Sequence, residues 1–97
     1  MAKKVLVVGD SPTDLQMLSR LLRKQGYEVT TAVDGEDALD KAAAQHPPLV
    51  LLDIILPKKN GFQVCRQLKT QAETNGIKVI LVSSKNQDSD KFWGMKQ

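Results

Sequence analysis

Three polar residues that can do chemistry lie at the ends of apolar runs: Asp10, Asp53 and Ser83. Two carboxylates about 4 Å apart repel each other by ~4 kcal/mol at an effective dielectric of 20, and a divalent cation removes that cost. Oxygen ligands with open water positions suit Mg²⁺, which also assists phosphoryl transfer to a carboxylate. Each residue alone is most simply a turn or cap residue, so the prediction of a magnesium site rests on their joint placement.

The apolar runs themselves indicate which elements position these residues. A continuous apolar run without alternation is typical of a strand that is buried on both faces of a parallel sheet. Four strands are expected, at 5–8, 27–32, 49–52 and 77–82. Four helices are expected between and after them, at 12–25, 36–45, 62–68 and 88–96. Ser11 is the expected N-cap of the first helix, and Pro12 suits its first position.

The order of these elements predicts an α/β fold with a doubly wound parallel sheet in one domain, residues 1–97. Loops at the carboxyl ends of such strands line a crevice where the strand order reverses. If the first and third strands are neighbours, Asp10 and Asp53 face each other across that point. A metal held there would lie in the same pocket as an incoming phosphate.

Composition excludes several classes of function. Cys65 and His46 are the only cysteine and histidine in the sequence, so an internal disulfide and Cys–His catalysis are not expected. The net charge is +3, but the lysines are scattered, so no nucleic-acid partner is expected. The apolar run at 5–8 is too short to be a signal peptide or a membrane span, and a cytoplasmic protein without a membrane partner is expected.

Residues 5–12, 51–62 and 79–85 closely resemble the receiver domains of bacterial two-component response regulators. The chemotaxis-type and twitching-motility-type single-domain receivers are the most similar. The most specific part of the resemblance is the spacing of Pro57 and Gly61 after Asp53. The resemblance extends from Lys4 to the last residue.

The resemblance implies a flavodoxin-like fold and a role for each residue that matches the family pattern. Asp53 would accept a phosphoryl group from a histidine kinase. Asp10, Asp53 and the backbone carbonyl of Ile55 would bind Mg²⁺, and Ser83 would be the switch hydroxyl that bonds the phosphoryl group. The chain would then act on a downstream protein by changing conformation. It would not be an enzyme beyond self-catalysed phosphotransfer and dephosphorylation.

Three residues depart from the family pattern. The family usually has two acids after the first strand, and Gly9 stands in place of the first of them. We expect weakened but not abolished Mg²⁺ binding, because Asp10 and Asp53 remain. Leu56 replaces a common Met at similar volume. Ser83 replaces the commoner Thr and loses a methyl group that restrains the rotamer.

The fourth departure is one of length. The family has a fifth strand with a phosphate-binding lysine, an aromatic switch residue and a fifth helix, whereas this sequence ends at Gln97. Lys85 and Lys96 do not take the place of that lysine. A truncated receiver is expected, with an open, apolar strand edge at 77–82 that invites a homodimer or a strand-swapped oligomer.

One other function remains as an alternative, and two more are disfavoured. The chain could be a receiver-like protein-interaction module in which phosphorylation and switching are impaired by Gly9 and by the missing lysine. An aspartyl-phosphate phosphatase on the same scaffold is disfavoured, because no general acid follows Asp53 at the spacing that such enzymes use. A nucleotide or flavin carrier is also disfavoured, because the turn at 9–12 has no glycine-rich phosphate loop.

Overall fold

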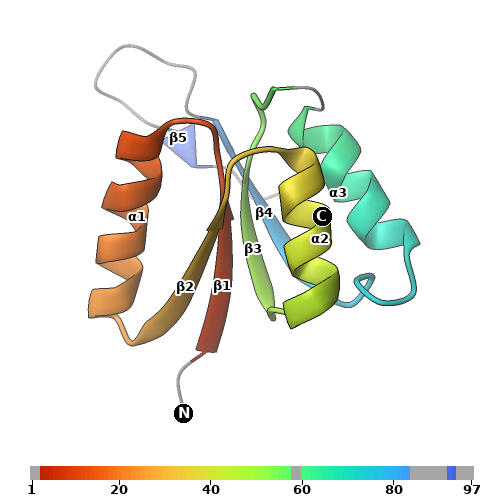
Figure 1. Ribbon diagram of the computed structural model, residues 1–97, viewed down its shortest axis with the longest axis horizontal. Coiled ribbons are helices and arrows are strands. Elements are labelled where there is room, and N and C mark those ends of the chain that lie inside the picture. Colours follow the sequence, from red (N-terminus) through yellow and green to blue (C-terminus); the bar gives the residue numbers. More distant parts are fainter. Residues whose placement is uncertain (1–2, 58–59, 84–91, 94–97) are drawn as a thin grey trace.

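The computed structural model describes residues 3–57, 60–83 and 92–93, with backbone only at 83 and 92–93 (Figure 1). The elements follow in the order β1 (Lys3–Val8), α1 (Pro12–Lys24), β2 (Tyr27–Ala32), α2 (Gly35–Gln45), β3 (Leu49–Asp53), α3 (Gly61–Thr70), β4 (Lys78–Ser83) and β5 (Phe92–Trp93). The first four strands and the three helices agree with the sequence-based predictions to within a few residues at each end.

The strands form one sheet in the order β2-β1-β3-β4-β5. The first four are parallel, and β5 runs antiparallel to β4. From β1 the chain passes to β2 on one side and later to β3 on the other, so the order reverses between β1 and β3. Helix α1 covers one face of the sheet, and α2 and α3 cover the other (Figure 1). The predicted doubly wound parallel sheet is therefore confirmed.

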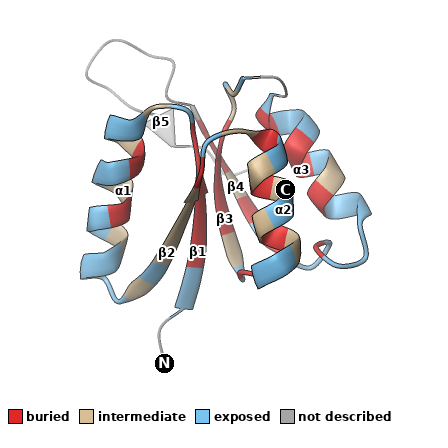
Figure 2. Cartoon of the chain, in the orientation of Figure 1, coloured by how far each residue is buried: buried red, intermediate tan, exposed pale blue. Residues whose placement is uncertain are grey.

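The core has two halves, one on each face of the sheet (Figure 2). Successive side chains of a strand point to opposite faces. Odd-numbered residues such as Val7 and Leu51 belong to the cluster that includes the apolar side of α1. Even-numbered residues such as Leu6 and Leu52 belong to the cluster with α2 and α3. This alternation decides which helix each residue at the carboxyl end of the sheet will meet.

Cys65 and His46 lie in different environments. Cys65 is buried in the cluster under α2 and α3, which suits a packing residue. His46 is exposed at the C-terminal end of α2. In the described part of the chain, no helix combines the length and the apolar character needed to cross a bilayer.

The first helix begins as its sequence predicts. The Oγ of Ser11 accepts the backbone N–H of Asp14 at 3.3 Å, and Pro12 occupies the first helical position. Arg23 and Lys24 lie in the last turn, where positive charge is favourable. The start of α1 directly follows β1, so this cap fixes the first helical turn beside the carboxyl end of the sheet.

Helix α3 begins with a reciprocal capping box. The backbone N–H of Gln63 donates to Oδ1 of Asn60 at 2.9 Å, and the backbone N–H of Asn60 donates to Oε1 of Gln63 at 3.1 Å. Two backbone donors at the helix start are satisfied in this way.

We expect Asn60→Ala to lower the free energy of unfolding by about 1 kcal/mol, because alanine cannot accept the Gln63 N–H. Urea denaturation followed by circular dichroism measures the change. Asn75→Ala is the matched control, because Asn75 is exposed and lies outside the helices. Equal free energies of unfolding for the two variants would show that the cap contributes nothing.

The helix predicted for 88–96 is wrong at Phe92 and Trp93, which form β5. Trp93 pairs with Val82, and Phe92 pairs with Ser83. The open edge predicted for the fourth strand is therefore also wrong at these two positions. Aromatic residues favour strands, and the edge of a sheet offers unpaired backbone groups, so edge pairing prevails over a short helical pattern. Residues 88–91 and 94–96 of that predicted helix lie outside the described residues.

Candidate functional site

The switch point between β1 and β3 brings Gly9 and Asp53 together. The register pairs Val8 with Leu52, so Gly9 and Asp53 occupy the next position on the two strands. A Cβ built on Gly9 would lie 3.7 Å from Oδ2 of Asp53. By the alternation of side chains, position 53 points toward the face that α1 covers. Asp53 is 7% exposed, so the carboxylate sits at the edge of the core rather than in solvent.

The backbone that follows Asp53 holds its carboxylate in place. The N–H of Ile55 donates to Oδ1 of Asp53 at 3.1 Å. The N–H of Ile54 donates to the carbonyl of Val82 at 2.9 Å, which continues the ladder with β4 by one residue. The orientation of the buried acid is therefore set by the turn that follows it and by the neighbouring strand.

Gly61 closes this turn from the other side. Its N–H donates to the carbonyl of Ile54 at 2.7 Å. A Cβ at Gly61 would lie 2.5 Å from the carbonyl oxygen of Asp53 and 2.8 Å from Cα of Ile54, which is closer than real Cβ contacts. Only glycine lets the start of α3 approach the backbone of Asp53 so closely. The spacing of eight residues between Asp53 and Gly61 thus has a steric cause.

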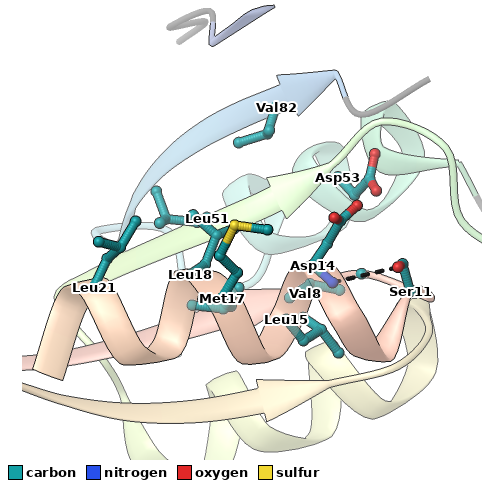
Figure 3. A pocket seen from close by; sticks show the side chains of 12 residues that line it. Val8, Ser11, Asp14, Leu15, Met17, Leu18, Leu21, Leu51, Asp53 and Val82 are labelled. Atoms are coloured by element: carbon teal, nitrogen blue, oxygen red, sulfur yellow. Dashed lines mark hydrogen bonds between the residues drawn. The ribbon is translucent and has the colours of Figure 1, made fainter. Parts of the chain in front are cut away.

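A pocket of about 240 Å³ opens on the α1 side of this edge (Figure 3). Asp14, Asp53 and Ser11 lie toward one end of the pocket, and apolar residues such as Met17 and Leu21 line the other. Met17 is 50% exposed and Leu21 is 56% exposed, so this apolar side of α1 is largely uncovered. The pocket thus joins an acidic end to an apolar wall.

Asp14 is an acidic residue of this pocket that was not among the site residues predicted from the sequence. In α1 it precedes Leu18 by four positions and Leu21 by seven, and such residues share one face of a helix. The usable signal was therefore an acid within the apolar stripe of the helix. Its place in the first turn of α1, where a negative charge favours the positive end of the helix, explains the acid locally and so conceals this signal.

The structure places the other predicted site residues as follows. Asp10 follows β1 at the same edge as Asp53, but its side chain is exposed and it is absent from the lining of the pocket. Ile55 is in the turn that bonds Asp53, with an exposed side chain. Ser83 is the last residue of β4, and its side chain lies outside the described part. The roles of all these residues in metal binding and switching stay predictions.

The donor groups at this edge fit a magnesium ion better than a softer metal. Within the described residues, no three His, Cys, Asp or Glu side chains are grouped so that they could hold a metal ion. A cation beside Asp53 would therefore take one or two carboxylates and complete its coordination with backbone carbonyls and water. Mg²⁺ is commonly bound in this way, because it keeps several water ligands.

The comparisons with known proteins decide the family. A family model described as the response regulator receiver domain matches residues 5–97. The chain belongs to this family. Receiver domains are the phosphoacceptor modules of two-component signalling systems, they bind Mg²⁺ at the active site, and they interact with histidine kinases and effectors. They are generally not enzymes. The predicted family and its signalling role are confirmed.

Individual relatives agree with this assignment. The receiver is 45% identical over 94 residues to protein PilH of Pseudomonas aeruginosa, with 97% of this chain and 78% of that protein covered. It is 40% identical over 96 residues to the alkaline phosphatase synthesis transcriptional regulatory protein PhoP of Bacillus subtilis. That match covers 99% of this chain but only 39% of the length of PhoP.

A solved relative has the same fold and a known metal. The receiver domain of a sensor histidine kinase from Pseudomonas aeruginosa PAO1 has a TM-score of 0.82 and 27% identity, with 93% of this chain and 74% of that chain covered. That structure is described with a magnesium ion coordinated in the active site cleft. The likeness supports the receiver fold found here.

Proposed function

We propose that this receiver accepts a phosphoryl group on Asp53 from a histidine kinase and thereby changes conformation to act on a protein partner. The observation that carries the proposal is that Asp53 is nearly buried, lines a pocket and is held by a backbone hydrogen bond. Asp53 as a residue is 7% exposed, yet it lines a pocket at the switch point of a doubly wound sheet. Its orientation is held by the N–H of Ile55. A nucleophilic carboxylate needs such a fixed and accessible position.

The proposed step is a displacement at phosphorus. A carboxylate oxygen of Asp53 attacks the phosphorus of a phosphohistidine, a new P–O bond forms, and the P–N bond breaks. The bonding pair leaves with the imidazole nitrogen of the kinase. The N–H of Ile55 bonds the Oδ1 of Asp53 and so helps to present the other oxygen to the donor.

Asp10, Asp53 and the carbonyl of Ile55 are the groups we propose to hold Mg²⁺. When bound, this ion would neutralise charge on the phosphoryl oxygens. We further propose that the hydroxyl of Ser83 bonds the phosphoryl group after transfer. A phosphoryl group adds nearly two negative charges and three acceptor oxygens to this edge. Moving a conformational equilibrium from 1:99 to 99:1 requires ~5.5 kcal/mol of differential stabilisation, which several charge-assisted bonds can supply.

The partners and the location follow from the same proposal. The donor is a histidine kinase, and the output is contact with a downstream signalling protein. A homodimer or strand-swapped oligomer stays a prediction, because pairing of β5 covers β4 only at Val82 and Ser83. A cytoplasmic location also stays a prediction.

The second candidate function is a protein-interaction module that is not phosphorylated. The observation that favours it is Gly9, which leaves this edge of the sheet with one carboxylate fewer than the family pattern. The two candidates differ in whether Asp53 reacts, so one chemical experiment separates them.

We expect the purified chain to gain the mass of one phosphoryl group when it is incubated with phosphoramidate and Mg²⁺. Intact-mass spectrometry measures the gain, and chelation of Mg²⁺ should prevent it. Borohydride reduction converts an aspartyl phosphate into homoserine, so peptide mapping should find homoserine at position 53. Phosphorylation elsewhere, or no mass gain with Mg²⁺ present, would contradict the proposal and favour the interaction module.

A further inference from the structure

We propose that Asp14 supplies, from α1, the negative charge that Gly9 does not provide at the magnesium site, and that it acts on the ion through bound water. The inference rests on the proposed function, since it assumes that Asp53 holds Mg²⁺. It assigns a role to a residue that the receiver pattern in the sequence did not single out. Asp14 is then a positioning residue for the ion and its water rather than a direct ligand.

Gly9 leaves a defined space beside Asp53. A Cβ on Gly9 would lie 3.5 Å from Cδ2 of Leu15 and 3.7 Å from Oδ2 of Asp53, which are ordinary contact distances. Among the described glycines, Gly26 alone has a positive φ, so the backbone at position 9 does not demand glycine. A side chain fits at this position, and a carboxylate there would stand directly beside that of Asp53.

Asp14 faces this same space from the helix. Both Asp14 and Asp53 line the pocket, and Figure 3 shows their carboxylates directed toward each other. The side-chain alternation explains the pairing: positions 9 and 53 point to the face that α1 covers. Asp10 is even-numbered, so the same alternation does not direct it to the face that α1 covers. Its side chain is exposed, and it is absent from the pocket lining.

The position of Asp14 is fixed by the chain around it. Its N–H is bonded to the Oγ of Ser11, and Leu15, the next residue, is buried in the core between α1 and the sheet. The side chain of Asp14 is neither fully buried nor fully exposed. A carboxylate held at this depth keeps contact with water and can accept a hydrogen bond from a water molecule on an ion.

Charge and coordination chemistry favour an indirect role. Facing carboxylates repel each other, and a divalent cation between them is attracted to both. Three acidic side chains grouped around one ion are not found in the described residues, so Asp14 does not complete a cage of direct ligands. Mg²⁺ keeps several of its waters in protein sites, and acids that bond such waters raise its affinity.

The test measures the Mg²⁺ dissociation constant of the whole chain from amide chemical shifts in an NMR titration with MgCl₂. We expect Asp14→Asn to raise the constant by about tenfold, the scale of an outer group that orients a metal site. Asp14→Glu keeps the charge and should stay within about threefold of the wild type. Asp40→Asn makes the same chemical change at an exposed acid of α2 and should leave the constant unchanged.

Rescue from position 9 distinguishes a charge effect from a structural one. Adding Gly9→Asp to Asp14→Asn should return the dissociation constant to within about twofold of the wild type, because the carboxylate is restored beside Asp53. Equal constants for Asp14→Asn and Asp40→Asn, or no rescue by Gly9→Asp, would overturn the inference. Spectra of each variant without metal report whether the fold is kept, and a loss of affinity that accompanies unfolding in both Asp14 variants also counts against it.

Failure of the inference differs from failure of the proposed function. If Asp53→Asn does not weaken Mg²⁺ binding, the ion lies elsewhere and the proposed site is wrong. If Asp53→Asn weakens binding and Asp14→Asn does not, the proposed site stands and only the role of Asp14 is lost.

Discussion

Asp53→Asn is expected to abolish phosphorylation of the receiver by small phosphodonors while the fold is kept. The amide oxygen of asparagine can still accept the N–H of Ile55, which bonds Oδ1 of Asp53 at 3.1 Å. The nucleophilic carboxylate is lost, however, and an amide does not attack phosphorus in its place. We therefore expect no mass gain, with a free energy of unfolding within about 1 kcal/mol of the wild type.

The control for this variant is Asp40→Asn. Asp40 is an exposed acid of α2, so the same loss of charge occurs away from the pocket. Intact-mass spectrometry after incubation with phosphoramidate and Mg²⁺ compares the two variants, and urea denaturation compares their stability. Undiminished phosphorylation of the Asp53 variant would move the acceptor to another residue.

Gly61→Ala is expected to destabilise the receiver by about 2–3 kcal/mol, the scale of overpacking in a close contact. The added Cβ would lie 2.5 Å from the carbonyl oxygen of Asp53 and 2.8 Å from Cα of Ile54, and neither backbone atom can swing aside as a side chain can. The start of α3 must then move away, and the hydrogen bond from Gly61 to Ile54 weakens. Phosphorylation should fall as well, because the turn after Asp53 is displaced.

Gly76→Ala is the matched control for this clash. A Cβ at Gly76 meets nothing within 4 Å, and the residue does not have a positive φ. We expect it to be neutral or to stabilise the fold by up to about 1 kcal/mol, because alanine restricts the unfolded chain. Urea denaturation of both variants checks the difference, and similar free energies of unfolding would mean that α3 adjusts to the clash without cost.

The parallel sheet and its helices could be predicted from the sequence because local and tertiary preferences agree there. The apolar run at 5–8 is buried on both faces, as a run without alternation requires, and so is the run at 49–52 except for the half-buried Leu49. Ser11 and Pro12 mark the start of α1 by chemistry that acts within one turn. The convergence of two strand ends then follows from the handedness of the crossovers.

The features that could not be predicted depend on contacts across the sheet. Phe92 and Trp93 were assigned to a helix from their spacing, but backbone groups at the edge of β4 determine their conformation. Asp14 lies in the first turn of α1, and nothing within that helix reveals that it will face Asp53. Both cases need the relative placement of elements, which a local pattern does not contain.

The sheet order has a consequence for how the molecule opens. Fraying begins at the outer strands, where backbone bonds to a neighbour exist on one side or are few, as for β2 and for the short pairing of β5. Gly9 follows β1 and Asp53 is the last residue of β3, and each of these two strands has a bonded strand on both sides. The outermost parts of the sheet can therefore open locally without separating the two positions at which the chemistry is proposed.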